Sequence, residues 1–155
     1  MPIKNDVVNI ALSYQARGFT IIPLLEQEKR SRHKWSEWEN GATEQQIISY
    51  YQQHPGDSVG CIPGKHLVVY DADTPESLAK LYEIEEACDC HPNLIAKTQK
   101  GEHHYFSVPD NVEVRQRSFN SKTHPACIDI KTGRCLVQMP PSGGKTWELT
   151  EAFDE

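Results

Sequence analysis

The sequence lacks any long apolar run, and no stretch approaches the ~18 consecutive apolar residues of a membrane-spanning helix. Residues 1–14 contain no continuous apolar segment of the kind that secretory signal peptides carry. Internal repeats and low-complexity tracts are also missing. These absences exclude a membrane-spanning helix and predict a chain without a signal peptide.

Positive charge is scarce, because 16 Lys and Arg stand against 22 Asp and Glu and give a formal net charge of −6. This balance argues against a generally basic nucleic-acid-binding surface but does not exclude a local basic track. The cysteine count of five is odd, which without a secretory signal predicts reduced thiols and a cytoplasmic location. With 155 residues, the chain has the length of a single domain with its own core.

Hydrophobic periodicity predicts a mixed α+β fold with a mainly antiparallel sheet. Helices are expected over residues 5–17, 43–53 and 75–87, with Asn5 or Asp6, Thr43 and Thr74 as their caps. Strands are expected over residues 19–24, 59–64, 66–73, 94–99, 103–108, 127–131 and 135–139. The last four strands are expected to pair as two hairpins, and residues 140–144 end the final strand.

Two acids follow an apolar strand at Asp71 and Asp73, and positions two apart share one face about 6.6 Å apart. Such paired carboxylates suit hard divalent ions, but they also suit an exposed helix N-terminus. Asp129 lies mid-strand on the same face as Lys131, where a metal shared with the other two acids would give it a partner. The alternative is a pairing of Asp129 with Lys131 or Arg134.

Two further sets are candidates for binding phosphate. His103 and His104 follow the Gly101 turn and point to opposite faces of their strand, so either one is placed for phosphate contact or proton transfer. A basic loop beside Trp35 and Trp38 suits a nucleic-acid backbone, or is a solvated loop anchored by the two tryptophans. Its cations are Lys29, Arg30, Arg32 and Lys34.

Two other motifs are weaker. Gly143-Gly144-Lys145-Thr146 resembles the end of a phosphate-binding loop, but Met139 stands where that motif needs its first glycine. Cys88, Cys90 and His91 form half of a zinc-site pattern that His124 and Cys127 would complete. The Cys-x-Cys spacing is unusual for zinc, so a reduced cysteine cluster in a polar turn is the preferred interpretation.

The order of these features is more specific than any one of them. It runs from A-L-S-Y-x-x-x-G-F and I-I-P-L (11–24) through the basic loop, Asp71-x-Asp73, Gly101-x-His103-x-Tyr105-Phe106 and Ile128-Asp129-Ile130-Lys131 to Pro140-Pro141-Ser142. Over about residues 7–147, this series resembles the bifunctional DNA primase/polymerase (prim-pol) domain of the archaeo-eukaryotic primase superfamily. The resemblance implies one catalytic domain over 1–155, with an RRM-like sheet flanked by helices and an acidic tail at 148–155.

The resemblance also implies roles for individual residues. Asp71, Asp73 and Asp129 would be the catalytic acids that hold two Mg²⁺ or Mn²⁺ ions. His103 would be catalytic at the nucleotide phosphates, with Lys131, Gly101 and Ser142 lining the nucleotide pocket. The expected partners are a single-stranded DNA template, dNTP or NTP, and a helicase domain or protein, in plasmid, phage or mobile-element replication.

The sequence therefore predicts DNA primase or polymerase activity by two-metal nucleotidyl transfer. One alternative is a catalytically inactive module that binds DNA or a nucleotide in a replication-initiation complex. Another is a metal-dependent nuclease or phosphohydrolase, since the same acids and ions can activate water.

Overall fold

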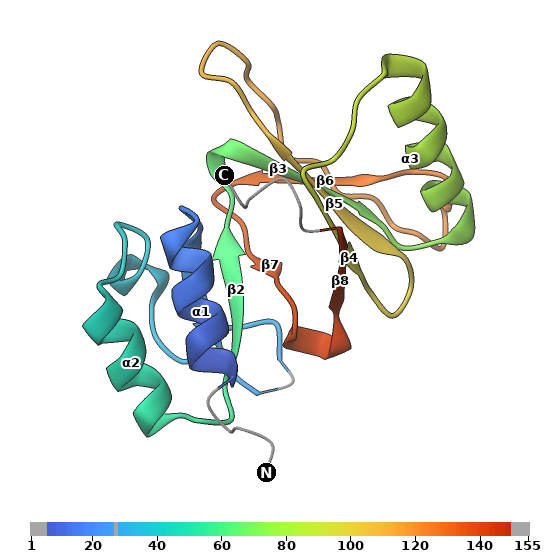
Figure 1. Ribbon diagram of the computed structural model, residues 1–155. Helices are drawn as coiled ribbons and strands as arrows, with labels where there is room; N and C mark the ends of the chain where they lie inside the picture. Colours follow the sequence, from blue (N-terminus) through green and yellow to red (C-terminus); the bar gives the residue numbers. More distant parts are fainter. Residues whose placement is uncertain (1–5, 27, 150–155) are drawn as a thin grey trace. The chain divides into compact units, whose positions relative to one another are not determined.

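The computed structural model describes residues 6–26 and 28–149 (Figure 1). Its helices are α1 (Asp6–Ala16), α2 (Glu44–Gln53) and α3 (Pro75–Cys88). Its strands are β1 (Thr20–Leu24), β2 (Ser58–Ile62), β3 (Gly64–Ala72), β4 (Leu94–Lys97), β5 (Glu102–Ser107), β6 (Asp129–Gly133), β7 (Val137–Gln138) and β8 (Thr146–Leu149). No described helix combines the length and apolar character needed to cross a bilayer.

The helices begin where the capping signals predict. The Thr43 side chain accepts a hydrogen bond from Gln46 N, and Thr74 and Ser77 form a reciprocal capping box ahead of Pro75. The predicted caps of the first helix lie outside the described side chains. Since β3 ends at Ala72 and Thr74 caps α3, Asp73 is held between a strand end and a helix start.

The chain forms two compact units. The first comprises the residues up to 62 together with 136–143, and it holds a three-stranded antiparallel sheet of order β1-β2-β7 with α1 packed on α2. Its core is apolar, with Ile22, Leu24 and Val59 fully buried. Trp38 is also buried, at 4% exposed, so this tryptophan anchors the basic loop to the core.

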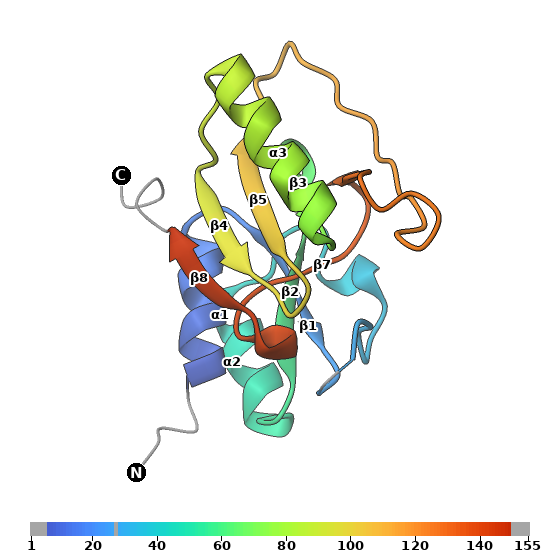
Figure 2. The same cartoon turned by 90° about the vertical axis from the view of Figure 1, so that its right-hand side faces the viewer.

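The second unit holds a five-stranded antiparallel sheet of order β6-β3-β5-β4-β8, with α3 across one face (Figure 2). Asp71 on β3 lies directly opposite His103 on β5 and Asp129 on β6. The neighbouring Tyr70 lies opposite His104 and therefore points to the other face, which α3 covers. Alternation thus separates an acidic face from a face that packs on α3.

Two predictions about the C-terminal strands are wrong. Residues 127–131 and 135–139 do not form a hairpin, because β6 pairs with β3 whereas β7 pairs with β2 in the other sheet. Val137 is fully buried opposite Cys61, so burial against β2 outweighs the local turn at 132–134. Residues 140–144 do not end the strands, since β8 follows and pairs with β4. Its four residues, TWEL, are too few for a clear periodic pattern.

Candidate active site

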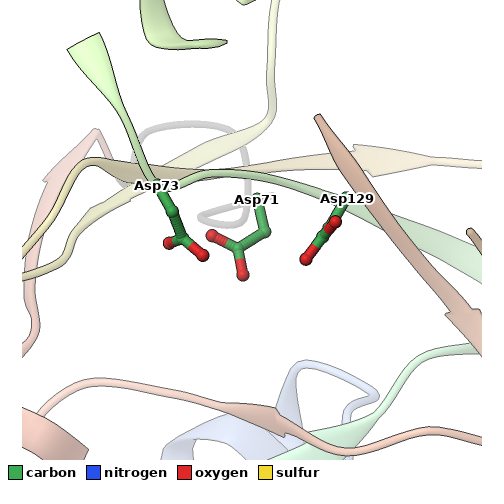
Figure 3. Close-up of side chains that lie close together, drawn as sticks. All are labelled: Asp71, Asp73 and Asp129. Carbon is green, nitrogen blue, oxygen red and sulfur yellow. The ribbon is translucent and has the colours of Figure 1, made fainter. Parts of the chain in front are cut away.

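The three predicted acids come together on one face of the second unit's sheet (Figure 3). Asp71 lies near the end of β3, Asp73 follows that strand, and Asp129 begins β6. One carboxylate oxygen from each lies within 4.8 Å of the others. Asp71 is only 6% exposed, so the interpretation of this residue as a solvent-exposed acid is wrong.

Two bases lie beside Asp71. Lys131 Nζ is 3.3 Å from Asp71 Oδ2, and His103 Nε2 is 3.3 Å from Asp71 Oδ1. The imidazole is not aligned for a hydrogen bond, so the buried Oδ1 has no hydrogen-bond donor among the described residues. His103 Nδ1 is likewise buried without a partner there. Buried polar atoms of this kind normally have a partner, so both atoms mark places where a ligand would be stabilised.

The acids differ in protonation behaviour. Burial by itself would raise the pKa of Asp71, but contact with His103 and the charge of Lys131 hold it well below its usual range. Burial and the neighbouring Asp71 carboxylate raise the pKa of Asp73 to about 6. Burial also lowers the pKa of His103, despite the opposing effect of Asp71. At neutral pH the imidazole is therefore neutral, and the excess charge of the acids is only partly compensated.

The segment between β5 and β6 completes the surroundings of the acids. Asp129 Oδ1 accepts a hydrogen bond of 2.7 Å from Phe119 N. A small cavity of about 10 Å³ is lined by Asp71, Asp73, Thr74, Ser77, Phe119, Ser121, Cys127 and Asp129. The sequence does not predict this hydrogen bond, because its donor is the backbone amide of Phe119 and not a side chain.

Gly101 and Ser142, the other predicted nucleotide-binding residues, have structural roles. A Cβ on Gly101 would lie 1.8 Å from Ala72 O, so this glycine allows close approach to the backbone just before Asp73. Ser142 belongs to the first unit, where its buried Oγ accepts from Val59 N at 2.9 Å and donates to Val59 O at 2.5 Å.

Gly101→Ala is expected to weaken metal binding and to destabilise the fold by about 1–3 kcal/mol through overpacking. The backbone of Gly101 is not left-handed, so alanine is conformationally tolerated and the effect comes from displacement of Ala72 and Asp73. Isothermal titration with Mn²⁺ and thermal unfolding measure the two effects. The exposed neighbour Lys100→Ala is the control, and equal metal affinity in both variants would contradict the role given to Gly101.

Two of the four cations in the predicted DNA-binding loop already pair with acids. Arg30 Nε lies 2.5 Å from Glu28, and Arg32 donates two hydrogen bonds of 3.1 and 3.0 Å to the buried Asp57. Tyr50 adds a third bond to Asp57, of 2.5 Å. Burial alone would raise the pKa of Asp57, but these bonds lower it. Lys29 and Lys34 are exposed and have no acidic partner among the described residues.

The cysteine pattern does not assemble a metal site in the described part of the chain. There the three aspartates form the one group of side chains placed to share an ion. Cys88, Cys90 and His91 are all exposed and do not belong to such a group.

A buried polar cluster behind the acidic face was not predicted. His104 is fully buried, with Nδ1 2.6 Å from Glu85 and Nε2 2.7 Å from Glu102. Tyr82 OH donates to Glu102 at 2.6 Å, so the cluster joins α3 to β5. Glu102 and His104 stand two apart in the sequence, but nothing local points to Glu85 on a distant helix.

A sequence model of the family described as bifunctional DNA primase/polymerase, N-terminal, matches residues 11–152. The chain belongs to this family. The prim-pol resemblance and the predicted α+β fold class are thereby confirmed. A search of curated proteins found no match to the chain. The three aspartates of this prim-pol domain all lie within the matched region, as do His103 and Lys131.

Proposed function

We propose that this prim-pol domain catalyses template-directed nucleotidyl transfer from a dNTP or NTP on single-stranded DNA. The grouping of Asp71, Asp73 and Asp129 within 4.8 Å carries the proposal. We treat both units as parts of one catalytic domain, because the family match runs through the residues of both.

The donor set fits a hard divalent cation. Three carboxylates supply only oxygen ligands, which Mg²⁺ and Mn²⁺ prefer. The buried Asp71 Oδ1 has no hydrogen-bond donor in the part of the chain that the structure describes. The pKa of Asp73 is raised to about 6, as expected where negative charge is under-compensated. Asp71, Asp73 and Asp129 would hold the ions. Bound there, divalent ions supply charge neutralisation at the reacting phosphate and lower the pKa of the attacking hydroxyl.

The remaining residues act on the nucleotide. A 3′-hydroxyl oxygen bonds to the α-phosphorus, the bond to the bridging oxygen breaks, pyrophosphate leaves, and the hydroxyl proton passes to solvent. Lys131 offers a fixed positive charge beside Asp71 for the phosphate oxygens. The neutral His103 ring carries its proton on Nε2, which faces Asp71 Oδ1 at 3.3 Å, so it would help to keep this carboxylate ionised beside the nucleotide phosphates.

The test is synthesis on single-stranded DNA with Mg²⁺ or Mn²⁺, with and without an annealed primer. Extension of the primer with release of pyrophosphate is the expected result, and product without a primer would establish primase activity. Asp71→Ala/Asp73→Ala protein, purified in parallel, controls for contaminating polymerases. Release of nucleoside monophosphate from DNA without extension would instead identify a nuclease. Metal-dependent nucleotide binding without turnover would identify an inactive binding module.

A further inference from the structure

The segment that joins β5 to β6 has Asp110 and Glu113 in its first part, but its later part, residues 114–128, is positively charged. Residues 114–128 contain Arg115, Arg117 and Lys122, together with His124, and no Asp or Glu. All 22 acidic residues of the chain lie outside residues 114–128. Figure 2 shows it as a long loop rather than a helix or strand. Its charge is therefore concentrated on a stretch of accessible chain.

These cations have no acidic partner within the described fold. Arg115, Arg117 and Lys122 are exposed, and among the residues the structure describes none of them lies within ion-pair distance of an acid. The Arg117 guanidinium lies 5.7 Å from the centre of the Phe119 ring, and this ring is only half-buried. A cation beside a partly exposed aromatic ring is a combination that suits nucleotide bases as well as phosphates.

The same loop is fixed directly to the acidic cluster. Arg117 and Ile130 exchange backbone hydrogen bonds of 2.9 and 2.8 Å. Arg117 therefore lies opposite the residue that follows Asp129 in β6. Phe119 N bonds to Asp129 itself, and Phe119 and Ser121 line the cavity at the aspartates. A strand held by this loop would therefore lie beside the candidate metal ligands.

We propose that residues 115–124 form a binding surface for a single strand of nucleic acid at the candidate active site. The inference deepens the proposed function, on which it rests, by assigning the strand to this loop. The loop competes for that role with the basic segment from Lys29 to Lys34. It is the stronger candidate because acids pair with two of the four cations of that segment and leave Lys29 and Lys34, whereas none of the loop's three cations has an acidic partner among the described residues. The loop is also bonded directly to Asp129.

Salt dependence tests the proposal with a matched pair of variants. The loop variant is Arg115→Ser/Arg117→Ser/Lys122→Ser, and the control is Lys29→Ser/Arg30→Ser/Lys34→Ser, which removes the same charge. Binding of a fluorescent oligothymidylate of about 30 nucleotides is followed by anisotropy in EDTA, so that neither metal nor catalysis contributes. Each phosphate contact contributes about 0.7 to the slope of log K against log salt for single strands.

The loop variant is expected to lower the magnitude of that slope by about 2. The ratio of wild-type to variant affinity should then be roughly 100-fold larger at 0.1 M than at 1 M salt. The control is expected to keep the wild-type slope. Equal losses in both variants, or a loss only in the control, would overturn the proposal. Lys122→Glu, at an exposed position, repeats the test if the triple variant fails to fold.

Failure of the surface assignment and failure of the catalytic proposal give different results. Wild-type protein that shows no salt-dependent binding to the oligonucleotide would overturn the surface assignment, even if primer extension succeeds. Conversely, failure of primer extension with normal oligonucleotide binding would reject catalysis and keep the surface.

Discussion

Asp71→Asn is expected to reduce the rate of nucleotide incorporation by about 1,000-fold. The substitution keeps the size of the side chain but removes the most buried of the three candidate charges. It also leaves Lys131 without its acidic partner at 3.3 Å. Single-turnover incorporation at saturating metal and nucleotide measures the loss at the chemical step, separately from product release.

The matched control is Asp110→Asn, which makes the same chemical change at an exposed position in the same unit. Asp110 contacts only His66 among the ion pairs of the described residues, at 3.4 Å. The control is expected to retain the wild-type incorporation rate. If Asp71→Asn keeps more than a tenth of wild-type activity, the acidic cluster is not the catalytic centre.

Asp73→Asn has the second large expected effect: it should stabilise the metal-free protein but abolish its stabilisation by metal. In metal-free protein it removes a carboxylate that burial and Asp71 disfavour, so the free energy of unfolding at pH 7 should rise by about 1 kcal/mol after allowance for solvent screening. For a chain of this length the unfolding midpoint rises by about 2–4 °C. Mn²⁺ should stabilise the wild type but not the variant.

The pH dependence follows from the direction of the shift. The pKa of Asp73 is raised in the folded state to about 6, so the stability linked to this group is fully present below its unfolded pKa and is lost as pH rises through about 6. The advantage of Asp73→Asn should therefore be largest at pH 7 and disappear near pH 4. Metal affinity of the wild type should fall below pH 6, because protons compete for the ligand.

Thermal unfolding in EDTA between pH 4 and pH 8 measures the first effect, and titration with Mn²⁺ measures the second. A metal-free Asp73→Asn protein that is less stable than wild type at pH 7 would show that Asp73 is a structural acid. Retention of the metal-induced shift in this variant would show that Asp73 is not a ligand.

Local signals were sufficient for most elements of the fold. The helix over 75–87 was predicted from Thr74 and Pro75, and the structure has it over Pro75–Cys88. Alternation along a single strand correctly put His103 and His104 on opposite faces, and the pairing of the strands then brings His103 and Asp129 opposite Asp71. These predictions succeeded because they depend on residues that are close together in the sequence.

Contacts between segments that are far apart in the chain could not be predicted from the sequence. The turn at 132–134 indicated a hairpin, but β7 pairs with β2 because burial of Val137 is decided by a strand far back in the chain. The hydrogen bond from Phe119 N to Asp129 and the contact of Glu85 with His104 have the same origin. Each depends on packing between segments whose proximity no local pattern encodes.

The adjacent histidines of β5 pose a problem of register during folding. A slip of one residue would place His104 opposite Asp71, where His103 now lies. Asp71 would then face an imidazole in either register. The histidines therefore cannot distinguish the two pairings. In the slipped pairing Glu102 would turn onto the face of the three aspartates, and Glu85 would lose its imidazole partner. Glu102 therefore favours the observed register, because its negative charge beside the three aspartates would destabilise the slipped pairing.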